Sequence, residues 1–247
     1  MHGLRRIVHN LLGRPVEVPL AACVHFGGWR YGRTGCNPYE DYCAGLTAHR
    51  PKAELQAAFT DFLRHYRPHD FGSALGVKLS QPHPLWQYPW ARRAAPPAWR
   101  LLPEDCPDIL THFSEAGVQT ARIEEEFRWL ESTYHSILKR GYAPAAHAGW
   151  PHARRLRAEN GAERFIILDG NHRIAALGAL EVSKVVVRCW SVQDVREADL
   201  ARWPGVRRGA WSRDDARAVF HAYFSGNQHP RRTEMPAPLI GAVTSDA

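Results

Sequence analysis

The chain has 247 residues, of which 45% are hydrophobic, and this is enough for one sizeable domain or two small ones. The composition excludes collagenous, coiled-coil and disordered proteins, no apolar run approaches a bilayer span, and the N-terminal segment is a poor signal peptide, so we expect a cytoplasmic protein. The formal net charge of +7 favours anionic partners without choosing among nucleotides, sugar phosphates, nucleic acid and anionic lipid.

The cysteines and histidines give no metal-binding motif. The five cysteines are Cys23, Cys36, Cys43, Cys106 and Cys189, an odd number with no CxxC pair. The spacings do not supply the closely placed ligands of a zinc site, so we expect reduced, partly buried thiols. The fourteen histidines are scattered and form no HExxH motif.

The first half of the chain contains one clear helix between two irregular segments. Residues 25–35 are rich in glycine, but no Gly-Lys-Ser/Thr closes them and no clear strand-to-helix context surrounds them, so a P-loop is excluded. Residues 52–66 place large apolar side chains on one face of a predicted helix, which ends before Pro68. Residues 80–103 combine many prolines with tryptophans, and we expect an ordered, irregular segment over the core.

The second half of the chain has sharper signals for regular structure. Apolar periodicity, an Asn-Gly turn and helix caps define the elements. In chain order they are a helix from Thr120 to a stop at Gly141, hairpin strands at 153–158 and 164–168, a buried helix at 174–180, a strand at 185–190 and a last helix from Ser212. We expect the final residues to be a loose tail.

The strongest chemical signal is Asp169-Gly170-Asn171-His172-Arg173, the DGNHR turn, between the second hairpin strand and the buried helix. Gly170 permits an unusual backbone angle, and the amides and dipole at the helix start favour a phosphate. His172 and Arg173 add donors, Arg173 can bind two oxygens, and Asp169 can orient these side chains or hold a metal ion. The local sequence is equally compatible with a plain connection in which Asp169 or Asn171 caps the helix.

The segment from Phe165 to Leu177, FIILDGNHRIAAL, resembles the signature of the ParB/sulfiredoxin superfamily. In that signature a strand ends in an acidic-Gly-x-His-Arg or Gly-Glu-Arg-Arg turn, and a helix of small residues follows. The resemblance covers residues 100–192 and implies an α+β fold, a small mixed sheet packed with helices. It implies three segments: an N-terminal irregular and helical extension at 1–99, a ParB/sulfiredoxin-like domain at 100–225 and a flexible tail at 226–247.

Within the superfamily the residues of the turn favour one activity. Sulfiredoxin-like enzymes place a reactive cysteine before His-Arg, where this chain has Asn171, so that thiol chemistry is not available. Chromosome-partitioning ParB proteins carry Gly-Glu-Arg-Arg and a following helix-turn-helix region, and this chain has neither. The nearest pattern is the Asp-Gly-His-His-Arg of free serine kinases, which bind an adenine nucleotide and phosphorylate a small hydroxyl compound.

The resemblance to these kinases implies a role for each residue of the turn. Gly170 to Arg173 would bind the phosphates of ATP or ADP, with His172 and Arg173 offsetting developing charge, while Asp169 would act on Mg²⁺ or on the substrate hydroxyl. An upstream glutamate would be the general base. Glu124 and Glu125 point away from the apolar face of their predicted helix, so Glu115, in the loop before it, is the preferred candidate.

The sequence therefore predicts a small-molecule kinase whose partners are a nucleotide and a small hydroxyl-containing acceptor. The first alternative is a ParB-like nucleotide- or nucleic-acid-binding protein without kinase activity, which includes CTP binding and nuclease activity. The second alternative is an interaction protein that keeps the fold and has lost the chemistry. The sequence does not identify the acceptor or the oligomeric state.

Overall fold

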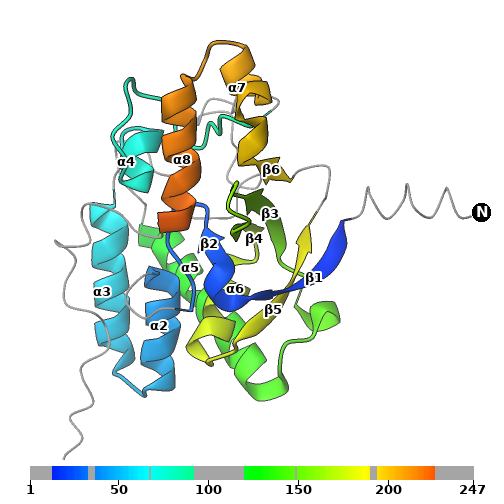
Figure 1. Ribbon diagram of the computed structural model, residues 1–247. Coiled ribbons are helices and arrows are strands. Elements are labelled where there is room, and N and C mark those ends of the chain that lie inside the picture. The colour runs from blue at the N-terminus through cyan, green and yellow to red at the C-terminus, as the bar shows by residue number, and fades with distance from the viewer. Residues whose placement is uncertain are drawn as a thin grey trace, which may run out of the picture.

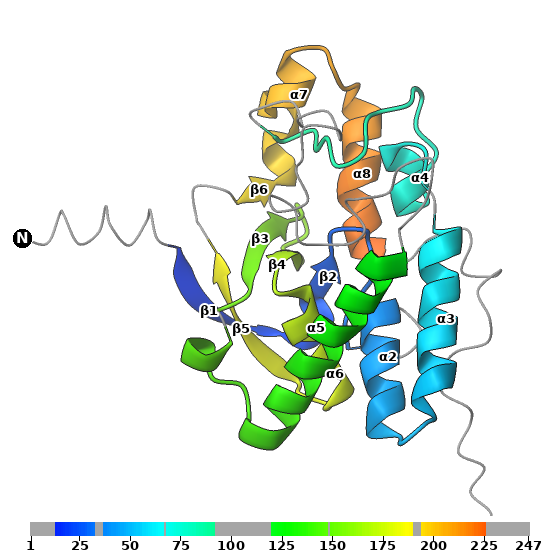
Figure 2. The same cartoon turned by 180° about the vertical axis from the view of Figure 1, so that it is seen from behind.

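The computed structural model describes residues 13–32, 37–66, 68–91, 120–147, 149–189 and 194–225. These residues form a mixed six-stranded sheet packed with seven α-helices, which confirms the predicted α+β class (Figures 1 and 2). The strands are β1 (Arg14–Pro19), β2 (Cys23–His25), β3 (His152–Arg157), β4 (Glu163–Asp169), β5 (Lys184–Cys189) and β6 (Val195–Arg196). The α-helices are α2 (Pro38–Thr47), α3 (Lys52–His65), α4 (Phe71–Leu75), α5 (Thr120–Arg140), α6 (Asn171–Ala179), α7 (Pro204–Arg207) and α8 (Arg213–Ser225), and short 3-10 turns lie at Leu20–Ala22, Pro144–Ala146 and Glu197–Arg202.

The sheet joins residues from both halves of the chain. Its strand order is β1-β5-β3-β4-β2, and the short strand β6 lies off this path and pairs with β3. β3 and β4 form the antiparallel hairpin, β1 is antiparallel to β5, and β2 is parallel to β4. Strands from the predicted N-terminal extension thus lie in one sheet with strands from the predicted ParB/sulfiredoxin-like domain. The boundary at residues 99 and 100 lies outside the described residues and stays a prediction.

Most elements predicted in the second half are confirmed. α5 ends before Gly141, which takes a φ of 71°, and the hairpin turn contains Gly161 at a φ of 83°. These are left-handed conformations that glycine adopts without steric cost. α6 begins at Asn171, so the helix includes the last three residues of the DGNHR turn. The predicted tail at 226–247 lies outside the described residues.

In the first half, α3 confirms the predicted helix, but the interpretation of residues 25–35 is wrong in one respect. β2 ends at His25 and α2 begins at Pro38, so a strand precedes this segment and a helix follows it. The side chain of Asn37 caps α2 by accepting hydrogen bonds from the amides of Tyr39 and Glu40. The segment is therefore a strand-to-helix connection, although it lacks the P-loop residues.

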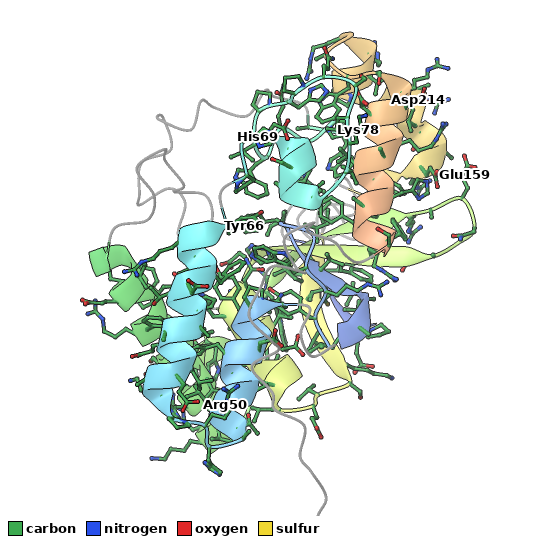
Figure 3. All side chains as sticks on the ribbon, turned by 90° about the vertical axis from the view of Figure 1, so that its left-hand side faces the viewer. Arg50, Tyr66, His69, Lys78, Glu159 and Asp214 are labelled. Carbon is green, nitrogen blue, oxygen red and sulfur yellow. The ribbon has the colours of Figure 1, made fainter. Side chains whose placement is uncertain are left out.

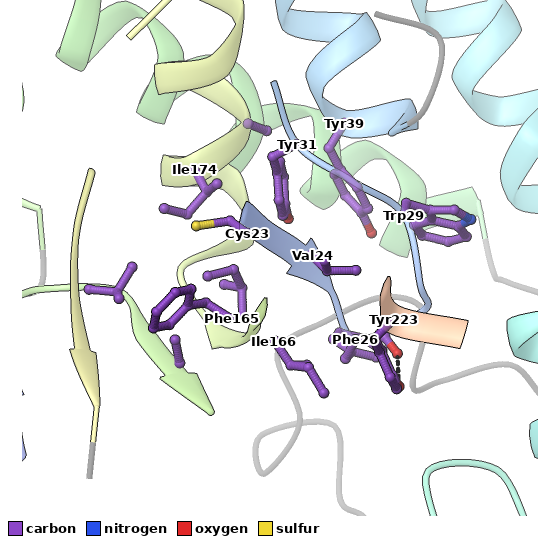
Figure 4. Packing of buried hydrophobic residues seen from close by; sticks show 14 of the residues in the cluster. Cys23, Val24, Phe26, Trp29, Tyr31, Tyr39, Phe165, Ile166, Ile174 and Tyr223 are labelled. Carbon is purple, nitrogen blue, oxygen red and sulfur yellow. Dashed lines mark hydrogen bonds between the residues drawn. The ribbon is translucent and has the colours of Figure 1, made fainter. Parts of the chain in front are cut away.

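Helices pack on both sides of the sheet. α2, α3, α5 and α6 form one group, while α4, α7 and α8 lie in another part of the molecule (Figures 1 and 3). Figure 4 shows Ile174 of α6 and Tyr39 of α2 on one side of β2, with Tyr223 of α8 on the other. The hydroxyl of Tyr223 donates a 2.8 Å hydrogen bond to the carbonyl of Phe26. The described part of the irregular proline-rich segment, residues 80–91, contains no helix or strand and buries Trp90.

Candidate functional site

Two strand-to-helix connections lie side by side at one edge of the sheet. β2 and β4 are parallel neighbours, and each leads into a helix, α2 after β2 and α6 after β4. These two helices also pack against each other (Figure 2). Ligands of α/β proteins commonly bind where the carboxyl ends of adjacent parallel strands meet the starts of the following helices. The DGNHR turn and residues 25–32 occupy this place.

Gly170 gives the turn its shape. Its φ of 90° and ψ of 23° are left-handed, and a Cβ atom at this position would lie 2.7 Å from Nη2 of Arg173. Both the backbone angle and the close approach therefore require glycine. Gly170 is also the N-cap of α6 and brings no side chain to the first amides of the helix. Such amides have no carbonyl partner within their own helix and, together with the helix dipole, favour an anion.

Arg173 is bound into the protein rather than extended toward solvent. Its guanidinium donates to the carbonyls of His147 (2.7 Å) and Gly149 (2.8 Å) and forms a 2.8 Å ion pair with Asp169. The planar guanidinium thus connects the segment before β3 to both ends of the turn. The side chain of Asp169 is 50% exposed, with Oδ2 held by Arg173. Arg173 consequently sets the orientation of Asp169.

His172 is paired with a glutamate of α5. Nε2 of His172 lies 2.6 Å from Oε1 of Glu126, whose side chain is fully buried, whereas the side chain of His172 is 20% exposed. Oε2 of Glu126 is buried and has no hydrogen-bond partner among the described residues. The ring of Tyr39 lies 5.6 Å from the His172 ring, between centroids. The structure thus presents a half-satisfied buried carboxylate behind an accessible imidazole.

Glu126 was not among the glutamates selected from the sequence. The preferred candidate, Glu115, lies outside the described residues, while Glu124 is exposed and Glu125 is partly exposed. A signal for Glu126 was present in the helical period, since it lies three residues after Ile123 and four before Leu130, both buried. A carboxylate on the apolar face of a helix requires a partner, and here that partner is His172.

Residues of the first half support the turn from the side of β2. The hydroxyl of Tyr31 donates a 2.9 Å hydrogen bond to Oδ1 of Asn171, and both side chains are buried. Nδ1 of the buried His25 accepts a 2.9 Å hydrogen bond from the amide of Gly27. The side chain of Asn171 is therefore a structural contact, and only its backbone amide, at the helix start, belongs to the candidate anion site.

Glu40 of α2 closes the space between this segment and α6. Its two carboxylate oxygens accept hydrogen bonds of 3.1 and 2.8 Å from the amide of Gly32. Its Cδ is close to Gly178, where a Cβ would lie only 2.6 Å away. Burial raises the pKa of Glu40 to about 7; the Gly32 hydrogen bond opposes this rise and the charge of Asp41 adds to it. The group therefore titrates near neutral pH.

The described residues offer limited means to hold a metal ion. They contain no group of three or more His, Cys, Asp or Glu side chains that could hold a metal. Magnesium commonly uses only one or two protein carboxylates together with substrate phosphates, so Asp169 fits Mg²⁺ as part of a nucleotide complex.

Cys23, Cys43 and Cys189 are buried free thiols, and burial raises the pKa of Cys189 to about 11. Among the residues that the structure describes, no helix is long and apolar enough to cross a membrane.

Comparisons with known proteins supply no relative on which to base a function. No family model, no curated protein and no solved structure matches the chain. The resemblance of the DGNHR turn to the ParB/sulfiredoxin superfamily stays a prediction, and the functional argument rests on the geometry of the site.

Replacing Gly170 by alanine should destabilise the protein more than the same change at Gly141. Both glycines have a positive φ, but a Cβ at Gly141 would meet nothing within 4 Å, whereas at Gly170 it would collide with Arg173. We expect Gly141→Ala to cost about 1 kcal/mol and Gly170→Ala to cost about 1–3 kcal/mol more. Urea unfolding measures both variants, and equal losses would show that Arg173 does not pack against the turn.

The contribution of Glu40 to the stability of the protein should fall as pH rises through its titration. Its raised pKa means that the folded state holds a proton that the unfolded state has released between pH 4.5 and about 7. The contribution of Glu40 to the free energy of unfolding should therefore decrease by about 2–3 kcal/mol across this interval. Glu40→Gln should lack this component in urea unfolding at pH 5 and 8, while Glu54→Gln, at an exposed helix position, should keep it. Identical pH profiles for wild type and Glu40→Gln would contradict this assignment.

Proposed function

We propose that the protein is a phosphotransferase that moves a phosphoryl group from ATP or ADP to the hydroxyl group of a small molecule. The observation that carries the proposal is the accessible His172 at the start of α6, hydrogen-bonded to the fully buried Glu126. Buried polar groups with an unsatisfied hydrogen-bonding atom are rare in native proteins and are often found at functional sites. A ParB/sulfiredoxin-like fold is part of the same proposal, supported by the order β3, β4, DGNHR turn, α6 and β5.

The nucleotide phosphates would bind at the start of α6. The backbone amides there and the helix dipole favour negative charge, and Gly170, as the N-cap, has no side chain that would cap these amides. The net charge of +7 for the whole chain favours the approach of an anionic nucleotide. These features supply binding and orientation, which account for much of the catalysis of phosphoryl transfer.

His172 would be the catalytic base and Glu126 its positioning residue. A carboxylate only accepts hydrogen bonds, so Nε2 of His172 would donate to Glu126, and in this tautomer the lone pair of the imidazole is on Nδ1. As the acceptor oxygen attacks the terminal phosphorus, its proton passes to Nδ1, and the bond from that phosphorus to the bridging oxygen breaks. The electron pair leaves with the nucleotide, and the imidazolium offsets negative charge. This assignment gives the proton-accepting role to His172 rather than to Glu115.

Asp169 and Arg173 would act beside this pair. Asp169 is half exposed and oriented by Arg173, and it would contact the acceptor hydroxyl or a magnesium ion carried by the nucleotide. When bound, the ion would neutralise phosphate charge. Arg173 already binds two carbonyls and Asp169, and its role would be to position Asp169.

Nucleotide binding and ATP hydrolysis together test the proposal, with water in place of the unknown acceptor. ATP or ADP with magnesium should raise the melting temperature of the wild type. His172→Ala should weaken nucleotide binding by about tenfold and abolish hydrolysis. Glu126→Gln should bind nucleotide nearly as well but hydrolyse it about 10²–10³-fold more slowly, because the imidazole loses its charged partner.

Glu124→Gln is the matched control, because it makes the same change at an exposed position of the same helix. It should leave binding and hydrolysis at the wild-type level. The kinase proposal fails if no nucleotide changes the melting temperature, or if both glutamate variants behave alike. Salt-sensitive DNA binding without nucleotide binding would instead support the nucleic-acid-binding alternative.

A further inference from the structure

A row of ionisable side chains crosses three strands beside the DGNHR turn. His152 of β3 is paired with Asp169 of β4 on one side and with Arg188 of β5 on the other. Directly paired residues of neighbouring strands project toward the same face of a sheet. A register shift between His152 and Ala153 brings Asp169, the first residue of the turn, into this row. The carboxylate, the imidazole and the guanidinium thus follow one another across the sheet.

Arg188, like Arg154 and Arg164 of this sheet, has no carboxylate partner among the described residues, whereas Arg155 and Arg157 have one. Arg155 forms a 2.7 Å ion pair with Asp194, and Arg157 forms one of 2.9 Å with Glu163. Among the described residues, no carboxylate forms an ion pair with Arg188, and its Nε is buried without a hydrogen-bond partner. An unsatisfied buried nitrogen of a charged group is costly. A ligand that accepts hydrogen bonds would remove this cost.

The pKa of His152 supports the proximity of the charges in the row. Burial lowers the pKa of His152 below its usual value, the charge of Asp169 opposes this, and the charges of Arg188 and Arg173 lower it further. His152 is therefore mainly neutral at pH 7 and can donate a hydrogen bond without adding charge. A bound anion would stabilise the imidazolium form and raise this pKa.

Asp169 does not prevent an anion from binding beside it, because its charge is matched by Arg173. The ion pair between them is 2.8 Å long and uses Oδ2 of Asp169. Asp169 therefore separates two places that favour negative charge, the start of α6 on one side and Arg188 on the other. A molecule with both an anionic group and a hydroxyl group can reach across this short distance.

We propose that Arg188 and His152 bind an anionic group, a carboxylate or a phosphate, of the acceptor whose hydroxyl is phosphorylated at the DGNHR turn. This inference rests on the proposed function and narrows the acceptor to hydroxy acids and hydroxyalkyl phosphates. A guanidinium is suited to this role because it binds either anion through two parallel hydrogen bonds.

Glycerate, glycerol 3-phosphate and glycerol are suitable probes, because they share hydroxyl groups and differ in the anion. NMR titration of the His152 ring at constant ionic strength measures their binding. One or both anionic probes should bind and raise the pKa of His152, and the stronger of them identifies the preferred anion, while glycerol should do neither. Arg188→Ala should weaken anion binding about tenfold or more.

Lys184→Ala is the matched control, because it removes a positive charge from the same strand at an exposed position paired with Glu17. It should leave anion binding unchanged. The inference is overturned if neither anion binds at millimolar concentration, if glycerol binds equally well, or if Arg188→Ala and Lys184→Ala have the same effect. Nucleotide binding is measured separately. Anion binding without nucleotide binding would defeat the kinase proposal alone. Loss of nucleotide binding in Arg188→Ala would place Arg188 in the nucleotide site instead.

Discussion

The hydrogen bond between the buried Glu126 and His172 is the interaction on which the candidate site depends. Removing a carboxylate from water costs several kcal/mol unless its oxygens are paired, and here only one oxygen has a partner among the described residues. Stability alone would favour an apolar residue at this position of α5. The pair holds α5 against α6 and fixes the imidazole at the mouth of the DGNHR turn. The proposed chemical role of His172 would account for this energetic cost.

The remaining contacts hold the turn in place around this pair. Arg173 connects Asp169 to the carbonyls of His147 and Gly149, and Gly170 leaves the space that the guanidinium needs. From the other side, Tyr31 binds Asn171. The site is therefore assembled by residues distant in the sequence, and the segment that follows β2 contributes to it directly. In the proposed mechanism, such support keeps the geometry of the site rigid.

The turns and helix ends that depend on local signals could be predicted from the sequence. The short strands and the side-chain partners that depend on tertiary contacts could not. The Asn160-Gly161 turn and the stop at Gly141 are local, and so is the strand-to-helix position of the DGNHR turn. β2 has only three residues, too short for a period, and β1 is an edge strand that contains Pro15 and Pro19. The partner of Glu126 on α6 and the position of Arg188 beside His152 depend on tertiary packing and strand pairing, which local signals in the sequence do not give.

The most direct test of the account is a crystal structure with a non-hydrolysable ATP analogue and magnesium. In the proposed binding mode, phosphate oxygens lie within about 2.7–3.2 Å of the first amides of α6, and the His172 ring, still bound to Glu126, faces the terminal phosphate. A nucleotide bound elsewhere on the molecule, with the start of α6 not contacting it, would contradict the central claim.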